Sequence, residues 1–234
     1  MAAITLIGPG RHGSAIARLF ASHGVGVTLY HHRPQKADLA AASVRQAATG
    51  AAEVTVAPTL AAAASANELI ILTTPWDSAQ RAVISELGDA LAGKVLLDVS
   101  NPLDITPSGV VPRRPAQGSA GQFVASLLPR GAGQAKAFSN LPTVAIAEGA
   151  DRDPLAVLPF AADSHATAEL VRPYLAATGW LPWLIGDISR SAALEIGGEL
   201  NVVQGRWGRA RLDAEQMLAY WGPEATIISA PNLG

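Results

Sequence analysis

The sequence predicts an α/β fold: a Rossmann-type, doubly wound parallel sheet with a small C-terminal α/β extension. Two observations support this class. Short apolar runs of strand length alternate with helix-forming, alanine-rich segments through residues 3–138. A glycine-rich turn, residues 8–13, leaves the first of these runs and opens a helix. Strands that alternate with helices favour a parallel sheet with right-handed crossovers.

The predicted strands of this N-terminal part lie at residues 3–7, 25–30, 53–56, 69–72, 94–99 and 134–138. The run 69–72 is apolar throughout, which is typical of a parallel strand buried on both faces. The first predicted helix follows the glycine-rich turn and ends near residue 23. The other predicted helices lie at residues 35–48, 60–66, 78–91 and 119–128. Asp77 is placed to cap the helix at 78–91. The proline-rich residues 105–121 are expected to form the longest irregular loop, and such loops are often lids or binding loops.

The last third of the chain predicts a further α/β unit. Strands are expected at residues 155–160 and 180–185, with a helix at 166–178 that either Asp163 or Ser164 would cap. A long helix is expected at residues 190–211. Residues 213–234 show no clear period.

The turn Gly8-Pro9-Gly10-Arg11-His12-Gly13 has the pattern of a dinucleotide-binding site, in its required context between a strand and a helix. Gly8 allows the tight turn, Gly10 lets a diphosphate approach the backbone, and Gly13 lets helix and strand pack closely. The helix N-terminus supplies free N–H groups and a partial positive charge. We therefore expect these six residues to bind a dinucleotide; the alternative is a tight turn without a ligand.

The end of the second strand indicates which dinucleotide binds. An NAD site carries Asp or Glu there to bind the ribose hydroxyls. This chain instead has a cationic cluster, which we define as His31, His32, Arg33 and Lys36. Arginine grips a phosphate with a planar fork and lysine adds a point charge. The cluster predicts a 2′-phosphate site, and hence NADP(H) rather than NAD(H); a solvated basic loop is the alternative.

Ligands of doubly wound sheets bind beyond the carboxyl ends of the strands. The loops after the fourth and fifth predicted strands should therefore meet the glycine turn at one crevice and orient the nicotinamide and its ribose. Their residues are Thr73, Thr74, Pro75, Trp76, Ser100, Asn101 and Pro102. Ser139, Asn140, Leu141 and Pro142, after the sixth strand, are expected to reach the same crevice. Ordinary turn chemistry is the alternative for Asn101 and Pro102.

Composition excludes several classes of protein. The chain has 234 residues, 15% of them charged, and a net charge of −2, which is ordinary for a compact α/β enzyme and gives no electrostatic reason to expect nucleic acid. There is no cysteine, so disulfides, thiolate metal sites and cysteine nucleophiles are excluded. No metal-ligand spacing is visible. No apolar run approaches the ~20 residues that cross a bilayer, so we expect a soluble, cytoplasmic protein without a membrane partner.

Taken together, these motifs resemble the NADPH-dependent F420 reductase family, the deazaflavin-linked NADP oxidoreductases. The resemblance covers most of residues 3–200 and includes the glycine turn and the cationic cluster. It rests also on Leu72-Thr73-Thr74-Pro75-Trp76, Asp98-Val99-Ser100-Asn101-Pro102, Lys136-Ala137-Phe138-Ser139-Asn140 and Gly186-Asp187-Ile188-Ser189.

The resemblance implies hydride exchange between NADP(H) and the deazaflavin coenzyme F420, bound face to face in a homodimeric protein. It implies a nicotinamide near residues 73–76 and a deazaflavin over residues 100–102, 139–142 and 186–189. We accordingly expect residues 1–150 to form the NADP-binding Rossmann domain. Residues 151–234 would form an extension that completes the acceptor site and contributes dimer contacts.

Hydride transfer between two cofactors needs little acid–base chemistry from the protein, so no catalytic residue is certain. One alternative is an NADPH-dependent reductase of a small carbonyl, imine or flavin acceptor, for which His12, Asp187 or Glu195 is a candidate proton donor. Ser139 is a further candidate, because it stands where some family members carry a histidine. The other alternative is a non-catalytic NADP-binding protein whose tail forms a dimer clasp with Met217, Tyr220 and Trp221.

Overall fold

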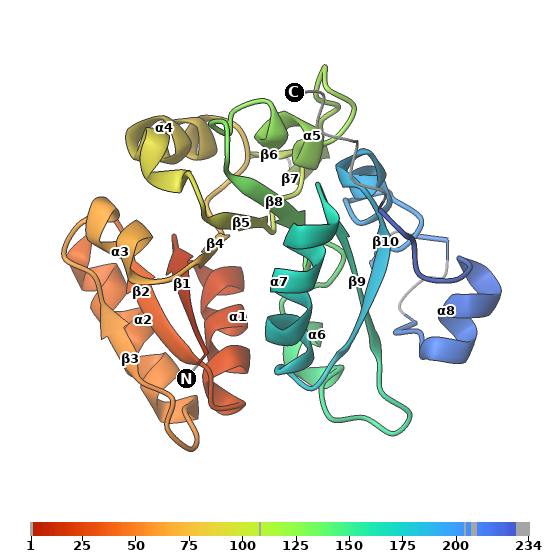
Figure 1. Cartoon of the computed structure of the whole chain (residues 1–234), viewed down its shortest axis with the longest axis horizontal. Helices are drawn as coiled ribbons and strands as arrows, with labels where there is room; N and C mark the ends of the chain where they lie inside the picture. The colour runs from red at the N-terminus through yellow and green to blue at the C-terminus, as the bar shows by residue number, and fades with distance from the viewer. Residues whose placement is uncertain (1, 108, 204, 207–209, 228–234) are drawn as a thin grey trace.

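The computed structural model describes residues 2–107, 109–203, 205–206 and 210–227. Within them, one sheet of eight strands has the order β10-β9-β8-β5-β4-β1-β2-β3 (Figure 1). Its strands are β1 (Ala3–Ile7), β2 (Gly26–Tyr30), β3 (Val54–Val56), β4 (Leu69–Leu72), β5 (Val95–Asp98), β8 (Gly133–Lys136), β9 (Val157–Ala162) and β10 (Leu181–Gly186). The order β3-β2-β1-β4-β5 is the doubly wound arrangement, and it confirms the predicted fold class.

In this sheet the strands β3, β2, β1, β4, β5 and β8 are parallel, but the other two strands break the pattern. β9 pairs with β8 in the antiparallel sense, with Ala135 opposite Ala162, and β10 runs parallel to β9. The link between β8 and β9 contains only the short helix α6 (Ala145–Glu148). Because no long crossover helix returns the chain to the amino edge of the sheet, β9 enters from the opposite edge.

Helices cover the two faces of this sheet with separate apolar layers, and alternate residues of β1 supply both. Ile4 and Leu6 pack with α1 (Arg11–Ser22), α2 (Pro34–Ala47) and α7 (His165–Ala176). Ile7 packs on the other face with three further helices, α3 (Leu60–Ala66), α4 (Ser78–Leu87) and α5 (Ala120–Ala125). Among the described residues, no helix is long and apolar enough to span a membrane.

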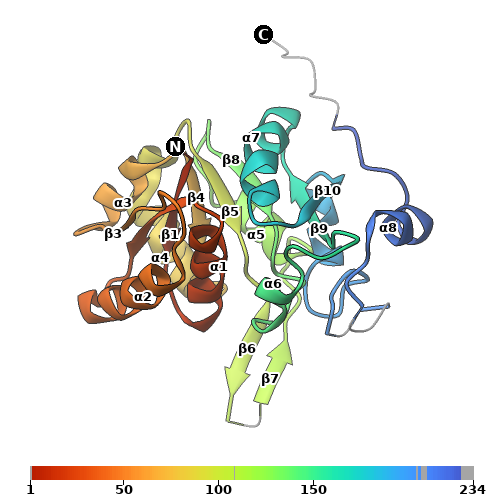
Figure 2. The ribbon, with the colours of Figure 1, turned by 90° about the horizontal axis from the view of Figure 1, so that it is seen from below.

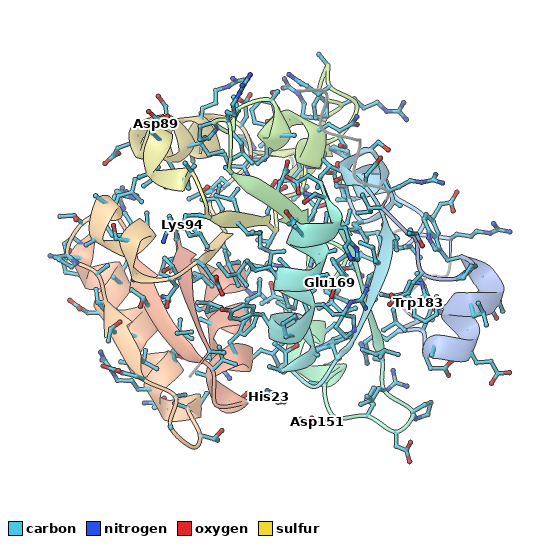
Figure 3. The ribbon with its side chains drawn as sticks, viewed as in Figure 1. His23, Asp89, Lys94, Asp151, Glu169 and Trp183 are labelled. Carbon is cyan, nitrogen blue, oxygen red and sulfur yellow. The ribbon has the colours of Figure 1, made fainter. Side chains whose placement is uncertain are left out.

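The C-terminal residues dock onto the outer strands of the same sheet. Met217 of α8 (Ala214–Tyr220) is buried in an apolar cluster with residues of β9 and β10. His23, at the end of α1, lies near Asp151, in the link before β9 (Figure 3). The Nε2 atom of His23 is 2.9 Å from the Oδ2 atom of Asp151. Because Met217 packs inside this chain, it is not available for the predicted dimer clasp.

The long helix predicted at residues 190–211 is wrong for the described part of that segment. A short 3-10 helix, η2 (Ile188–Ala193), is followed by turns. Gly197 has a φ of +81°, in the left-handed region that favours glycine, and a Cβ on Gly198 would fall on neighbouring carbonyl oxygens. The glycines turn the chain, and the turn carries Glu195 into the interior, where it is 3% exposed.

The prolines at residues 105–121 do not produce an irregular loop throughout. β6 (Leu103–Thr106) and β7 (Gly109–Pro112) form an antiparallel hairpin that projects from the body of the molecule (Figure 2). Gly109 has a φ of +121°, which suits the tight connection. Pro107 and Pro112 lie in the connection and at the end of an edge strand, where a missing N–H is tolerated.

The structure shows which of the predicted capping residues cap their helices. Asp77 precedes α4 but does not cap it, because its φ is +68° and its carboxylate accepts a 2.9 Å hydrogen bond from Arg81 Nε instead. α4 ends at Leu87, before Gly88, and a 3-10 turn, η1 (Gly88–Leu91), completes the predicted segment. Ser164, rather than Asp163, caps α7 by accepting a hydrogen bond from its first turn.

Helix α8 lies in the tail for which no period is visible. Asp213 and Gln216 form a capping box: Asp213 Oδ1 accepts from Gln216 N at 2.9 Å, and Asp213 N donates to Gln216 Oε1 at 3.1 Å. The Asp-x-x-Gln spacing was the available sequence signal for this helix.

A buried ion cluster joins the middle of the sheet to the C-terminal segment. Lys136 Nζ lies 2.6 Å from Asp98 Oδ2, 3.3 Å from Glu195 Oε1 and 2.8 Å from the carbonyl oxygen of Ser100. Glu195 also accepts hydrogen bonds from two N–H groups at the start of α5. Burial alone lowers the pKa of Lys136, but the charges and hydrogen bonds of Asp98 and Glu195 raise it above its usual value. The lysine is therefore charged in the folded protein.

Replacing Lys136 with methionine should lower the free energy of unfolding by roughly 3–5 kcal/mol, because two buried carboxylates lose their countercharge. Urea titration measures this loss. The matched control is Lys94→Met, because Lys94 is partly exposed and donates one bond, to the Asn67 carbonyl at 3.1 Å. The control should cost about 1 kcal/mol or less. Equal small losses in both variants would contradict a strongly coupled buried cluster.

Candidate functional site

A cleft of about 990 Å³ lies over the carboxyl ends of β1, β4 and β5. It brings together most residues that the sequence predicted for a cofactor site. The predicted residues that line it are Gly8, Gly10, Arg11, His12, Gly13, His31, His32, Lys36, Thr73, Thr74, Pro75, Trp76, Ser100 and Asn101. The predicted residues that do not line it are Pro9, Arg33, Pro102, Ser139, Asn140, Asp187 and Glu195.

The glycine turn exposes the start of α1 to the cleft. Gly8 has a φ of +86°, and a Cβ there would lie 2.8 Å from Thr74 Cγ2. A Cβ on Gly13 would fall on Thr73 Oγ1, so α1 approaches the end of β4 closely, as predicted. At Gly10 a Cβ would meet nothing nearer than 3.9 Å. The first turn of α1 contains no acidic residue, and its first N–H groups have no partner within the helix, so the turn suits an anion.

The cationic cluster lies at the end of β2 and the start of α2. The rings of His31 and His32 stack with their centroids 4.4 Å apart, and His31 Nδ1 accepts a 2.9 Å hydrogen bond from Arg33 N. Burial, followed by the charges of His32, Lys36 and Arg33, lowers the pKa of His31. The permanent charge of the cluster therefore comes from the exposed side chains of Arg33 and Lys36. Arg33 stands beside the cleft rather than in its lining.

The loops after β4 and β5 contain polar groups of two kinds. Thr73 Oγ1 donates to the carbonyls of Ile7 and Gly8, at 3.0 and 2.7 Å, and so fastens β4 to the glycine turn. Thr74 Oγ1, Trp76 Nε1 and Ser100 Oγ are shielded from solvent and have no hydrogen-bond partner in the described chain. Unpaired buried polar groups at the wall of a cleft are expected where a ligand binds.

Asn101 lines the cleft, but its amide is already engaged. Its Nδ2 donates to the Ser139 carbonyl at 2.8 Å, and its Oδ1 accepts from Ile196 N at 2.6 Å. Asn101 therefore ties the β5 loop to the β8 loop and to the C-terminal segment, and its ligand contacts are limited to the remaining surface of the side chain.

Ser139 and Asn140 are each 2% exposed, because the C-terminal segment covers the β8 loop. Ser139 Oγ lies 3.4 Å from the Leu194 carbonyl, and Val202 N donates to the Asn140 carbonyl at 2.8 Å. The expectation that these two residues reach the crevice is therefore wrong in this structure. Sequence position after a strand does not reveal a distant segment that packs on top.

Two further candidate proton donors, Asp187 and Glu195, also lie away from the cleft. Asp187 caps η2, where its Oδ1 accepts from Ser189 N at 2.9 Å. The carboxylate of Glu195 belongs to the buried ion cluster with Lys136. Within the described ranges, no group of three or more histidine and acidic side chains is placed to hold a metal ion.

Leu141 and Pro142, which were predicted to reach the crevice, do line the cleft. Several other lining residues were not predicted. β6 adds Leu103 and Asp104, the loop after β8 adds Thr143, and the helices α3 and α4 add Leu60, Ala79, Ala82, Val83 and Glu86. Asp104 Oδ2 accepts a 2.6 Å hydrogen bond from Arg113 Nη1, so Arg113 is paired at the base of the hairpin. None of these residues belongs to a recognisable motif; only the packing of loops and helices around the cleft identifies them.

His12 links the glycine turn to the loop after β8. Its Nδ1 lies 3.1 Å from Thr143 Oγ1, and its ring also hydrogen-bonds with the backbone of Phe138, whose φ is +62°. Burial lowers the pKa of His12, and the Phe138 bond offsets only part of this effect. The ring is therefore neutral near pH 7 and has partners within the protein, which suits a brace between the two cleft walls better than a proton donor.

The lowered pKa of His12 predicts a pH-dependent stability. Between its folded pKa and the unfolded value of about 6.5, the unfolded chain binds more protons than the folded chain. The stability contributed by neutral His12 is thus complete above about pH 6.5 and is lost as the pH falls through the folded pKa. In His12→Gln, the decrease in melting temperature between pH 7.5 and a mildly acidic pH should be smaller than in the wild type. The matched control is His165→Gln, at an exposed position on α7; an equal change in both variants would contradict the assignment.

Known proteins share features of this fold and site. The family described as "NADP oxidoreductase coenzyme F420-dependent" matches residues 3–102. No curated protein matches the chain. Among solved structures, a hypothetical protein from Sinorhizobium meliloti has a TM-score of 0.71 and 22% identity, covering 91% of this chain and 96% of that protein. A proposed F420-dependent NADP reductase from Arthrobacter sp. FB24 has a TM-score of 0.63 and 24% identity, covering 82% of this chain and 88% of that one.

A third similar structure is the reductive aminase from Aspergillus terreus in complex with NADPH and ethyl levulinate. Its TM-score is 0.59 and its identity 24%; the match covers 83% of this chain but only 58% of the aminase. At these identities the structures share the fold with this chain. The family match includes the glycine turn, the cationic cluster and the β4 and β5 loops. The resemblance predicted from the sequence is thereby confirmed over residues 3–102, and the protein is an NADP-dependent oxidoreductase.

Proposed function

We propose that the protein transfers a hydride between NADP(H) and the deazaflavin coenzyme F420. The observation that carries this proposal is the family match over the residues that form most of the cleft. The cleft volume of about 990 Å³ is at the upper end of the range for small-molecule sites, as two cofactors that bind together would require.

The residues of the cleft fit a phosphorylated dinucleotide. The open position at Gly10 and the free N–H groups of α1 suit a diphosphate, while Arg33 and Lys36 suit a 2′-phosphate. Strand order supports one direction for the ligand, with the adenosine toward β2, the diphosphate over β1, and the nicotinamide toward β4 and β5. Thr74, Trp76 and Ser100 offer unpaired polar groups at the nicotinamide end.

When bound, NADPH supplies the hydride, the acceptor takes one proton from solvent, and NADP⁺ remains. The protein contributes position rather than acid–base chemistry. The glycine turn and the cationic cluster hold the dinucleotide at one end of the cleft. Leu103, Leu141 and Pro142 offer apolar surface for a planar ring and exclude water at the other end.

A second candidate is an NADPH-dependent reductase of an imine or carbonyl compound. The structural likeness to the reductive aminase favours it, as does the burial of Ser139 and Asn140. These residues belong to the surface on which the resemblance implied a deazaflavin.

We further propose that residues 1–150 form the NADP-binding domain and that residues 151–234 form an extension of it. We also propose that the protein is a cytoplasmic homodimer and that the cleft residues have the roles given above.

The assay that tests the function mixes the protein with NADPH and coenzyme F420 and follows the visible absorbance of the deazaflavin. NADH and a flavin serve as parallel controls. Rapid bleaching with NADPH supports the proposal. Tight NADPH binding without bleaching contradicts the deazaflavin as acceptor, and imines and carbonyls are then the acceptors to assay.

Replacing both Arg33 and Lys36 with alanine should raise the KM for NADPH by about tenfold or more and change the KM for NADH little. The reason is that only NADPH carries the 2′-phosphate, and charge-assisted hydrogen bonds to it are lost. Steady-state kinetics with each cofactor measures the difference. The double variant Arg18→Ala/Arg130→Ala removes the same charge from exposed positions outside the cleft. Equal weakening of both cofactors would show that the cluster does not bind the 2′-phosphate.

A further inference from the structure

Thr143 carries a hydroxyl that His12 holds at the wall of the cleft. Thr143 lies in the loop between β8 and α6, is half-buried and lines the cleft. His12, in the first turn of α1, lines the cleft as well, and its Nδ1 is 3.1 Å from Thr143 Oγ1. The hydroxyl is therefore fixed by a partner from another element and needs no rearrangement to meet a ligand.

The partners of His12 determine which way the proton of this hydroxyl points. Burial lowers the pKa of His12, so the ring is neutral near pH 7 and has a single N–H. The hydrogen bond to the Phe138 backbone acts in the opposite sense and raises the pKa, which is the effect of a bond that the ring donates to the carbonyl. With its N–H used in this way, the ring accepts at Nδ1 from the Thr143 hydroxyl. The oxygen of Thr143 thus keeps its remaining lone pairs for the cleft.

The backbone of the loop keeps Thr143 in this position. Phe138 is fully buried with a φ of +62°, and its carbonyl also accepts from Leu141 N at 3.1 Å. On the other side of Thr143, Ala145 N donates to the Pro142 carbonyl at 2.9 Å. Backbone bonds therefore close the turns on both sides, so the hydroxyl is oriented before a ligand binds, which lowers the entropy cost of binding.

Thr143 belongs to the end of the cleft that we propose for the hydride acceptor. Asn101 Nδ2 donates to the Ser139 carbonyl at 2.8 Å and so holds the loops after β5 and β8 together. The residues that follow these loops line one end of the cleft, Asp104 after β5 and residues 141–143 after β8. The carboxylate of Asp104 and the oxygen of Thr143 are both hydrogen-bond acceptors. This end therefore suits a compound with an N–H group better than one that offers only a carbonyl oxygen.

We propose that the oxygen of Thr143 accepts a hydrogen bond from an N–H group of the hydride acceptor, a proposal that rests on the proposed function. Both leading classes of acceptor carry such a group. The pyrimidine ring of an oxidised deazaflavin has an imide N–H between two carbonyls, and a protonated imine has an N–H on the reacting carbon–nitrogen bond. A ketone has no N–H, so Thr143 favours the first two classes over ketones.

The experiment measures dissociation constants of coenzyme F420 and of its derivative methylated at the imide nitrogen. Deazaflavin fluorescence reports binding to the protein saturated with NADP⁺. The wild type should bind F420 more tightly than the derivative. Thr143→Val keeps the shape of the side chain but removes the hydroxyl, so this preference should fall about fivefold, the value of roughly one net hydrogen bond. Thr143→Ser restores a hydroxyl and should keep the wild-type preference.

Two further variants separate this role from a structural one. His12→Leu keeps the Thr143 hydroxyl but removes the group that holds its proton, so the preference should fall partway; general loss of structure would weaken both compounds and leave their ratio unchanged. Thr55→Val is the matched control, because Thr55 is exposed on β3 outside the cleft and its hydroxyl donates to Thr28 Oγ1 at 3.1 Å. It should keep the wild-type preference.

An undiminished preference in Thr143→Val overturns this proposal while leaving the proposed function intact. A wild type that neither binds nor reduces F420 contradicts the proposed function, and a second assay then decides this proposal. It measures kcat/KM with NADPH for the cyclic imine pyrroline and for cyclopentanone, a ketone of the same ring size. Thr143→Val should lower kcat/KM about fivefold for the imine and leave it unchanged for the ketone. Equal changes for both compounds, or turnover of neither, overturn the proposal.

Discussion

The buried ammonium group of Lys136 holds the central part of this structure together. It is fully buried and contacts Asp98 on β5, the Ser100 carbonyl at the edge of the cleft, and Glu195 in the C-terminal segment. A charge in the interior is tolerated only when paired and hydrogen-bonded, so these groups must assemble together. Glu195 in turn bonds the first N–H groups of α5. One buried cation therefore couples the sheet, the cleft loop and the C-terminal segment.

The order of the parallel strands explains how one cleft serves chemically different parts of a dinucleotide. β1 lies between β2 and β4, and each strand ends in a loop at the same edge of the sheet. The β2 loop carries cationic side chains, the β1 loop carries glycines and free N–H groups, and the β4 loop carries hydroxyls and an indole. Charge, backbone amides and neutral polar groups thus follow one another across neighbouring strands.

The end of the cleft that we propose for the hydride acceptor depends on the part of the chain that departs from a parallel arrangement. β9 and β10 run opposite to β8, and the segment after η2 returns over the β8 loop, where Val202 bonds the Asn140 carbonyl. This packing buries Ser139 and Asn140 and leaves Leu141, Pro142 and Thr143 as the part of the loop that lines the cleft. This end of the cleft is therefore lined by apolar side chains, the His12 brace and the base of the β6–β7 hairpin.

The strands β1 to β5, the glycine turn and the cationic cluster could be predicted from the sequence, because periodicity, glycine spacing and charge act over a few neighbouring residues. The capping box at Asp213 involves residues three positions apart, so it could be recognised in the sequence although α8 shows no hydrophobic periodicity. Three features could not be predicted from the sequence: Glu195 turns inward to Lys136, Ser139 lies against the Leu194 carbonyl, and β9 is antiparallel to β8. Each of these depends on contacts between residues distant in the chain, where buried charge and hydrogen-bond satisfaction override local propensity.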